Sequence, residues 1–361
     1  MKKHPLHLTG DLLEDETFLK TLKRHQGRFV LLTDENVGAL YSKPFLNFMN
    51  DHELECAHVT FPAGESSKTR ETKERIEDEL LAKKFGRDTL LITMGGGVVT
   101  DLGGFVAATY LRGIPYLSIP TSLLAMVDAS IGGKTGVNVK EAKNVIGAFY
   151  PPSALFIDLS MLSTLPDRDI LYGSAEVLKA ALISDSPFYD YLEEHADLWN
   201  VRDQAFLKKV ITESIKIKQK VVERDEKEGG ERRVLNFGHT IAHGIETLEE
   251  YQMPHGEAVA LGMIVEALIA YKMGHLKETD FDAITSLIKK MGFALKLSKK
   301  VTTPAMQEVI LRDKKAAGQK PRFVILDGIG KVQSYKGDYC TSIDETLLEE
   351  ALGWMIAEFG T

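Results

Sequence analysis

The stretch LNFGHTIAHGIETLEEYQMPHGEAVAL, residues 235–261, decides how the second half of the chain folds and where its chemistry lies. His239 and His243 are four residues apart, so they project from one face of a predicted helix. Another stripe of that helix is apolar and can be buried: Phe237, Ile241, Ile245 and Leu248. His255 follows Pro254 and begins a second apolar helix, which can bring a third imidazole toward the first two. Imidazoles with a supporting carboxylate suit zinc, so the spacing indicates a metal site; the alternative is ordinary polar histidines on a helix surface.

Length and composition limit the class of protein. A chain of 361 residues predicts two domains. The net charge of −8 argues against a nucleic-acid surface. The only cysteines, Cys56 and Cys340, make neither a disulfide framework nor a thiolate metal site, which favours a reducing cytoplasm. The first residues lack the apolar run of a signal peptide, and the longest apolar stretch, 258–273, is too short to span a bilayer. We therefore expect a cytoplasmic protein without a nucleic-acid or membrane partner.

The first half of the chain alternates between strand-like and helix-like segments. Strands are expected at 28–33, 89–94, 114–119 and 154–158, and helices at 68–84 and 98–110. This alternation predicts an α/β domain with a parallel sheet and helices on both faces, which we bound at residues 1–164.

Helical periodicity dominates after residue 165. Helices are expected at 170–183, 186–195, 202–223, 236–250, 255–273, 279–291 and 343–358, with one strand at 322–326. The sequence therefore predicts a second, mainly α-helical domain over residues 165–361.

Glycines at a strand-to-helix junction give a second signal. Gly95, Gly96 and Gly97 end one expected strand and precede a helix, whose N-terminus offers free N–H groups to a phosphate. The spacing GGGxxxDxxG differs from the ordinary dinucleotide fingerprint, so a tight turn is the alternative. Asp34 and Asn36 follow another strand, where open α/β sheets bind ligands; a helix cap is the alternative there.

Lysines in unusual settings give a third signal. The segment IGGKTGVN, residues 131–138, predicts a glycine-rich loop that presents Lys134, together with Lys143, to an anion. It lacks the first glycine of an ATPase phosphate loop, because Asp128 stands there. Lys218 shares a helix face with apolar residues and either snorkels to the rim or meets an anion in a cleft.

Glu176 and Lys179 also share one helix face. Without a partner they form an ordinary ion pair, but near the histidines Glu176 becomes a candidate metal ligand.

Taken together, these residues resemble the 3-dehydroquinate synthase family over nearly the whole chain. The similar blocks are GGGVVTDLGGF at 95–105, PTSLLAMVDASIGGKTGVN at 120–138, KNVIGAFYPP at 143–152, AEVLKAALI at 175–183, LNFGHTIAHGIE at 235–246, HGEAVALGM at 255–263 and DKK at 313–315. The resemblance implies an N-terminal dinucleotide-binding α/β domain joined to a helical metal- and substrate-binding domain. Thr100 and Ser122 depart from the usual family residues, glycine and threonine.

The resemblance also implies functional residues. Zinc, or cobalt in its place, would be bound by Glu176, His239 and His255. NAD would be bound by Asp34, Asn36, Glu65, Lys68, Gly96, Gly97, Val98, Asp101, Thr121, Ser122, Lys134, Lys143 and Thr164. The substrate would be bound by Asp128, Lys134, Lys143, Asn144, Lys179, Lys218, Arg232, Asn236, His243, Lys314 and, from a neighbouring subunit of a homodimer, Arg112. The catalytic residues would be His243, Lys134, Asp128 and Glu228.

The implied activity converts 3-deoxy-D-arabino-heptulosonate 7-phosphate into 3-dehydroquinate and phosphate, within the shikimate pathway to aromatic amino acids. NAD would oxidise the substrate transiently, allow β-elimination of phosphate and then return the hydride before an aldol ring closure. Three alternatives stay open at this point: another sugar phosphate cyclase, a metal-dependent polyol dehydrogenase, and a nucleotide-binding regulator.

Overall fold

A computed structural model describes residues 5–139, 142–315 and 321–361, without the side chains of residues 142 and 312–315. The chain divides into two compact units, residues 1–166 and 167–361, and each is described by itself.

The first unit is built on a parallel sheet. Its strands lie in the order β1-β8-β5-β4-β2-β3, with bounds Leu6–Thr9 (β1), Phe29–Asp34 (β2), Cys56–Phe61 (β3), Leu90–Gly95 (β4), Tyr116–Pro120 (β5) and Ala154–Asp158 (β8). Because β2 lies between β3 and β4, the strand order reverses there, and the carboxyl ends of β2 and β4 are neighbours. Such a switch point is where open α/β sheets bind ligands.

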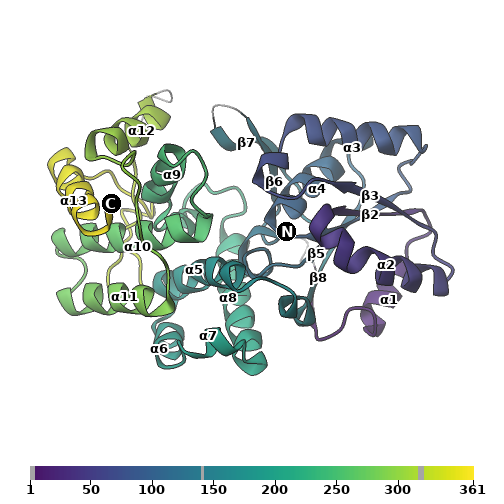
Figure 1. Ribbon diagram of the computed structural model, residues 1–361, viewed down its shortest axis with the longest axis horizontal. Coiled ribbons are helices and arrows are strands. Elements are labelled where there is room, and N and C mark those ends of the chain that lie inside the picture. The colour runs from purple at the N-terminus through teal and green to yellow at the C-terminus, as the bar shows by residue number, and fades with distance from the viewer. Residues whose placement is uncertain (1–4, 140–141, 316–320) are drawn as a thin grey trace. The chain divides into compact units, whose positions relative to one another are not determined.

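Helices cover both faces of this sheet (Figure 1). They are α1 (Glu16–Lys23), α2 (Glu35–Asp51), α3 (Arg70–Ala82) and α4 (Gly97–Thr109). Val30 and Leu32 of β2 are buried in one core with Ile76 of α3. On the other face, Phe18 of α1 makes an edge contact with Phe156 of β8. The buried strands alternate their side chains between two apolar cores, as a doubly covered sheet requires.

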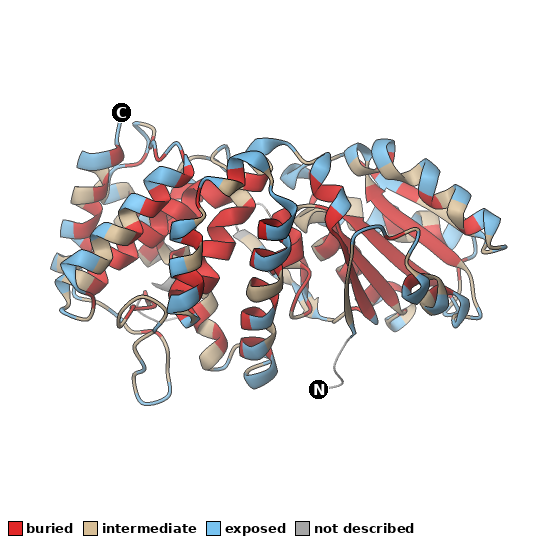
Figure 2. Cartoon of the chain, turned by 90° about the horizontal axis from the view of Figure 1, so that it is seen from below, coloured by how far each residue is buried: buried red, intermediate tan, exposed pale blue. Residues whose placement is uncertain are grey.

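The second unit is helical. Its helices are α5 (Asp167–Ser184), α6 (Ser186–Glu194), α7 (Leu198–Val201), α8 (Gln204–Arg224), α9 (His239–Leu248), α10 (His255–Lys272), α11 (Glu278–Met291), α12 (Thr303–Lys315) and α13 (Glu345–Phe359). Every residue of α10 from 256 to 270 is buried, which is typical of a helix that is apolar all round. α10 contacts α5, α9, α11 and α13, and its buried residues form part of the red interior in Figure 2.

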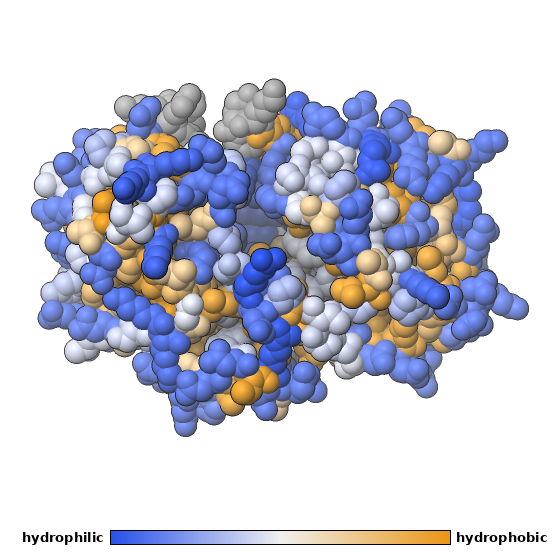
Figure 3. All heavy atoms as spheres, viewed as in Figure 1, coloured by the Kyte–Doolittle hydropathy of each residue, from blue (hydrophilic) through white to orange (hydrophobic). Residues whose placement is uncertain are grey.

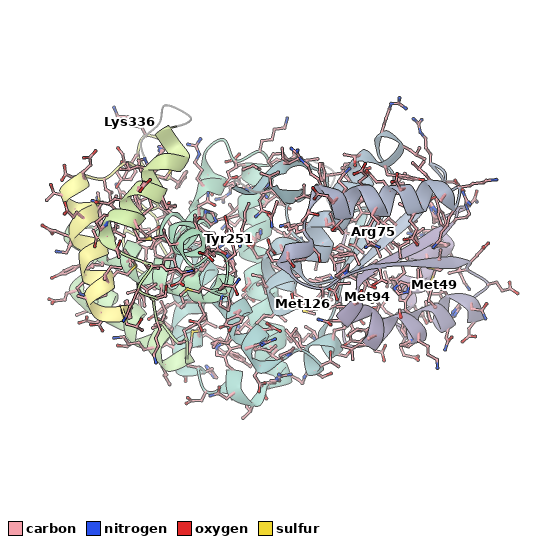
Figure 4. All side chains as sticks on the ribbon, turned by 45° about the horizontal axis from the view of Figure 1, so that its top comes forward. Met49, Arg75, Met94, Met126, Tyr251 and Lys336 are labelled. Carbon is pink, nitrogen blue, oxygen red and sulfur yellow. The ribbon has the colours of Figure 1, made fainter. Side chains whose placement is uncertain are left out.

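The predicted fold class is confirmed, since an α/β unit with a parallel sheet precedes a mainly helical unit. Interior methionines contribute to the first unit: Met49 of α2 and Met94 of β4 are both buried, and Figure 4 labels them. Polar side chains cover much of the visible surface, with scattered apolar patches (Figure 3). Among the described residues, no helix is both long enough and apolar enough to cross a membrane.

Two expectations about local structure were wrong. The expected glycine-rich loop at residues 131–138 is limited to its start, where Gly132 and Gly133 have φ of 94° and 66°. From Lys134 the chain forms β6 (Lys134–Val139), which pairs in antiparallel fashion with β7 (Ala142–Phe149). Glycine allows β6 and β7 to approach closely, since a Cβ on Gly147 of β7 would lie 1.9 Å from the carbonyl oxygen of Thr135 in β6. Residues 322–326 do not form a regular strand either, since they make only isolated bridges, Phe323 to Thr341 and Leu326 to Val332.

Candidate active site

Three candidate metal ligands lie close together in the second unit. Glu176 lies in the middle of α5, while His239 and His255 are the first residues of α9 and α10. The Nε2 atoms of His239 and His255 lie 3.4 Å and 3.5 Å from Oε1 of Glu176. One donor atom from each of the three residues lies within 4.8 Å of the others. This cluster is named the metal centre below.

The donor set of the metal centre fits zinc. A tetrahedral Zn²⁺ with bonds of about 2.0–2.1 Å to nitrogen or oxygen separates its ligand atoms by about 3.4 Å. The two distances from the Glu176 carboxylate to the histidines match that spacing. Both carboxylate oxygens of Glu176 are buried, and the side chain forms ion pairs with Lys179, His239 and His255. Two imidazoles and a carboxylate are a donor set of catalytic zinc sites.

The other ring nitrogen of each histidine has its own partner. Nδ1 of His239 lies 3.1 Å from the carbonyl oxygen of Phe237. Nδ1 of His255 lies 3.3 Å from Oε1 of Glu246, a buried residue of α9. A proton on Nδ1 that donates to these oxygens leaves the Nε2 lone pair for a metal.

Charge is balanced inside the metal centre. Burial alone would raise the pKa of Glu176, but the Lys179 ammonium and the two histidines hold that pKa well below its usual value. Burial alone would lower the pKa of His255, yet hydrogen bonds to Glu176 and Glu246 outweigh it and raise that pKa to about 10.

The start of α9 is fixed by close backbone packing. Gly238 caps the helix in the left-handed region, with φ of 80°, where glycine is favoured. A Cβ on Gly238 would lie 2.8 Å from the Met263 side chain, and a Cβ on Gly262 would lie 1.9 Å from the Gly238 carbonyl oxygen. The Gly238 N–H donates to the buried carboxylate of Glu266 at 2.9 Å. These contacts hold α9 against α10 directly beside His239.

Buried cations lie in the same unit. Lys179, Lys218 and Arg232 are 3%, 8% and 1% exposed. Arg232 belongs to the turn Glu231–Asn236, which contacts α8, the helix that carries Lys218. The Arg232 guanidinium donates to the carbonyl oxygen of Glu226 at 2.6 Å. The expectation that Lys218 lies on an apolar helix face is thus confirmed.

The remaining predicted residues of this unit are arranged as follows. His243 is exposed, and its ring centroid lies 5.6 Å from that of His239, beside the three donors rather than among them. Asn236 donates to Oε1 of Glu228 at 2.7 Å. The side chain of Lys314, in α12, lies outside the described part of the chain.

Several of the residues predicted to bind NAD lie at the carboxyl edge of the sheet in the first unit. Gly96 caps α4, and Gly97 is the first residue of that helix. Thr121 follows β5 and donates its N–H to the Gly95 carbonyl at 2.9 Å, while Ser122 lies close to Gly96. Asp34 is the last residue of β2, and its carboxylate accepts a hydrogen bond from the Val37 N–H at 2.9 Å. Asp34 therefore caps α2, as the alternative interpretation of this residue expected.

A polar network extends this edge. Lys68 is buried, and its ammonium donates to Asp101 of α4 at 2.5 Å and to Asn144 of β7 at 2.6 Å. Glu65 accepts a hydrogen bond from Asn138 of β6 at 2.7 Å. The sequence could not show that the β6–β7 ribbon is tied to Lys68.

The last predicted residues of the first unit lie on turns or at its surface. Asp128 lies in the helical turn Ala125–Ala129, and Lys134 is exposed at the start of β6. Thr164 is hydrogen-bonded to the Tyr41 hydroxyl at 2.6 Å. Four others are held on elements already described: Asn36, Val98, Lys143 and Asn144.

Arg112 stands in an unusual backbone. It is exposed, and both it and Leu111 adopt left-handed conformations, with φ of 69° and 48°. Such conformations cost roughly 1–2 kcal/mol per residue outside glycine. The neighbouring structure must therefore impose this turn, which holds Arg112 at the surface.

Sequence reasoning missed the carboxylates behind the metal centre, Glu246 and Glu266. Glu246 follows His239 by seven residues, which is two helical turns, so it lies on the same side of α9. That spacing was a usable signal. Glu266 of α10 gave no such signal, because its contact with Gly238 depends on how two helices pack.

The structure combines a parallel-sheet α/β unit with a helical unit that contains a candidate metal centre. Comparisons with known proteins identify the family. Residues 58–172 match the family description "3-dehydroquinate synthase N-terminal", and residues 173–316 match "3-dehydroquinate synthase C-terminal". The chain is 41% identical to the 3-dehydroquinate synthase of Nitrosospira multiformis over 348 residues, which cover 96% of this chain and 94% of that protein. The chain belongs to the 3-dehydroquinate synthase family.

Two solved structures are similar over nearly their full length. One is 2-epi-5-epi-valiolone synthase from Streptomyces hygroscopicus subsp. jinggangensis 5008 with NAD⁺ and Zn²⁺ bound: 28% identity, a TM-score of 0.90, and coverage of 99% of this chain and 98% of that one. The other is 2-deoxy-scyllo-inosose synthase complexed with carbaglucose-6-phosphate, NAD⁺ and Co²⁺: 26% identity, a TM-score of 0.86, and coverage of 97% and 96%.

Proposed function

We propose that this protein is a 3-dehydroquinate synthase, which converts 3-deoxy-D-arabino-heptulosonate 7-phosphate into 3-dehydroquinate and phosphate. The observation that carries the proposal is the metal centre, in which buried Glu176 and half-buried His239 and His255 have the spacing of zinc ligands, in a chain of this family. Bound metal would polarise the substrate oxygen that is oxidised and reduced, and NAD⁺ would accept and return the hydride.

The residues of the second unit would bind and orient the substrate. Glu176, His239 and His255 hold the metal, and exposed His243, one turn after His239, moves protons at the reacting oxygen. Lys218 and Arg232 are buried on elements that contact one another, which suits recognition of one carboxylate. Other polar side chains complete the substrate site in this proposal: Lys179, Asn236, Glu228 and Lys314.

The residues of the first unit would bind the cofactor and the phosphate. Gly96 and Gly97 bring backbone N–H groups and the positive end of α4 to a cofactor phosphate, and Asp34 accepts hydrogen bonds from a ribose. A preorganised polar network lies in the same unit, where Lys68 donates hydrogen bonds to Asp101 and Asn144. The proposal also assigns NAD or substrate contacts to these residues of the first unit: Asn36, Glu65, Val98, Thr121, Ser122, Asp128, Lys134, Lys143 and Thr164.

A different cyclase activity is the second candidate, because the two similar solved structures carry the names of other cyclases. The 41% identity to a 3-dehydroquinate synthase exceeds the 28% and 26% identities to those structures. A direct comparison of turnover on phosphorylated sugars with and without a carboxylate separates the two candidates.

The proposed reaction is tested by counting turnovers. The metal-loaded enzyme is supplied with the heptulosonate phosphate and with NAD⁺ at one tenth of the substrate concentration, and released phosphate is measured. Because the hydride is returned in each cycle, phosphate should exceed NAD⁺ many times over with no net NADH absorbance. Product that stops at the amount of NAD⁺ supplied would instead identify a polyol dehydrogenase.

We also propose a cytoplasmic homodimer in which Arg112 contributes to the substrate site of the neighbouring subunit. Arg112 is exposed on a turn of imposed left-handed backbone, and Cys56 and Cys340 are free thiols. Arg112→Ala and His239→Ala chains, each inactive, should regain activity when mixed and reassociated, because one site of the heterodimer keeps both native residues. Proven mixed dimers without recovered activity would assign Arg112 to the site of its own chain.

A further inference from the structure

Glu246 is a buried carboxylate that the proposed reaction does not use. It lies on α9, two turns after His239, and is 2% exposed. Its Oε1 lies 3.3 Å from Nδ1 of His255, the first residue of α10. A buried carboxylate is costly unless it is paired or hydrogen-bonded, so a glutamate at this position is tolerated only because partners meet it.

The backbone of Glu246 is also fixed. Its carbonyl oxygen accepts the Tyr251 N–H at 2.8 Å, where the chain reverses between α9 and α10. Glu250 and Tyr251 both adopt left-handed conformations in this reversal, with φ of 51° and 60°. Tyr251 is labelled in Figure 4. Glu246 therefore contacts the reversal before α10 through its backbone carbonyl and the first side chain of α10 through its carboxylate.

The two imidazoles of the metal centre differ in the group that faces Nδ1. Nδ1 of His239 faces a neutral carbonyl oxygen, whereas Nδ1 of His255 faces a carboxylate. A carboxylate accepts a stronger hydrogen bond, orients the ring and makes the opposite nitrogen a better donor to a metal. Nε2 of His255 is the atom that lies 3.5 Å from Oε1 of Glu176.

We propose that Glu246 is a positioning residue of the metal centre, which holds His255 in the Nδ1–H tautomer with Nε2 directed at the metal position beside Glu176. This inference rests on the proposed function, because it assumes that Glu176, His239 and His255 bind the metal. Glu246 itself touches neither the substrate nor the metal. Its effect on activity is exerted through the affinity of the site for zinc.

The test compares Glu246→Gln with a matched control, Glu257→Gln. Glu257 is another buried glutamate at the start of α10, but its carboxylate accepts the backbone N–H groups of Ala294 and Leu295. The full-length enzymes are stripped with a chelator, and Zn²⁺ affinity is measured by competition with a chromophoric chelator. Thermal unfolding of each variant is measured in parallel.

Glu246→Gln should lose about tenfold in Zn²⁺ affinity, and Glu246→Ala up to about a hundredfold, as expected for removal of a carboxylate behind a metal-binding histidine. Glu257→Gln should lower the melting temperature while Zn²⁺ affinity stays within about twofold. A purely structural role for Glu246 would give the result expected of the control. Zn²⁺ affinity of folded Glu246→Gln within about twofold of the wild type would overturn the proposal.

The wild type and His255→Ala separate this inference from the proposed metal centre. If the wild type binds one Zn²⁺ per chain and His255→Ala does not, the metal centre stands and Glu246→Gln alone decides the role of Glu246. If His255→Ala binds Zn²⁺ as the wild type does, the metal centre fails and the role of Glu246 fails with it.

Discussion

The metal centre of the second unit and the carboxyl edge of the sheet in the first unit are built in different ways. The metal centre consists of ionisable side chains in mutual contact: Glu176 lies beside both histidines, and it also pairs with the neighbouring Lys179. The sheet edge offers backbone groups at Gly96 and Gly97, with the side chain of Asp34 at the end of the neighbouring strand β2. Side-chain substitutions should therefore abolish the function of the metal centre but only weaken ligand binding at the sheet edge.

The largest effect is expected from His255→Ala. Removing a ligand should eliminate tightly bound metal, and polarisation by a metal supplies several kcal/mol, so kcat should fall by about a thousandfold or more. Metal content by atomic emission and far-UV circular dichroism check this expectation. Full metal occupancy in the folded variant would remove His255 from the ligand set.

The next effect concerns the buried cation Arg232. Charge-assisted hydrogen bonds contribute roughly 1.5–3 kcal/mol, so Arg232→Ala should lose about one to two orders of magnitude in kcat/KM. Arg232→Lys should recover only part of this, because an ammonium lacks the guanidinium fork. The KM for NAD⁺ should hardly change.

The adjacent residue provides the control for Arg232. Arg233 pairs with Asp338 at 2.9 Å and has no assigned role in substrate binding. Arg233→Ala should reduce thermal stability while kcat/KM stays within about twofold. Equal losses of kcat/KM in the two alanine variants would show that Arg232 has no specific role in recognition.

A smaller effect is expected at the sheet edge from Asp34→Asn. An asparagine still caps α2, so the melting temperature should change little, but a neutral side chain accepts a weaker hydrogen bond from ribose. The KM for NAD⁺ should rise about tenfold with kcat nearly unchanged. Asp34→Ala should additionally lose about 1 kcal/mol of stability through the missing cap. An unchanged KM for NAD⁺ in Asp34→Asn would leave Asp34 with its capping role alone.

The smallest effect is expected at an ion pair to which no role in the reaction is assigned. Burial would raise the pKa of Asp338, but hydrogen bonds from Arg322 and Arg233 lower it to about 2. A depressed carboxyl pKa stabilises the fold above the unfolded value of 3.8, and this stabilisation disappears as the pH falls from about 4 to about 2. Asp338→Asn should cost about 1–2 kcal/mol near pH 7 after allowance for solvent screening.

The pH dependence of thermal unfolding checks this ion pair. The difference in melting temperature between wild type and Asp338→Asn should be largest near neutral pH and should vanish toward about pH 2. If the difference in melting temperature does not depend on pH, the substitution acts through packing and not through charge.

Local patterns were sufficient for much of this molecule. The apolar periodicity of residues 236–250 and 255–273 predicted α9 and α10, and the buried runs at 28–33 and 89–94 predicted β2 and β4. Short or edge elements were missed, among them β3 and α12, because half-polar segments carry little periodic signal. Residues 134–138 were mistaken for part of a loop, because the sequence does not show that Gly136 of β6 lies against Gly147 of β7.

The sequence by itself determined the class of fold, the candidate ligands Glu176, His239 and His255, and the resemblance to a family, because helical spacing and motif order are local properties. Only the tertiary structure decided that Glu176 lies within 3.5 Å of both histidines, that Glu246 supports His255, and that Lys68 joins Asp101 to Asn144. Those contacts join residues that lie on different elements, and the packing of whole helices and strands determines which side chains meet.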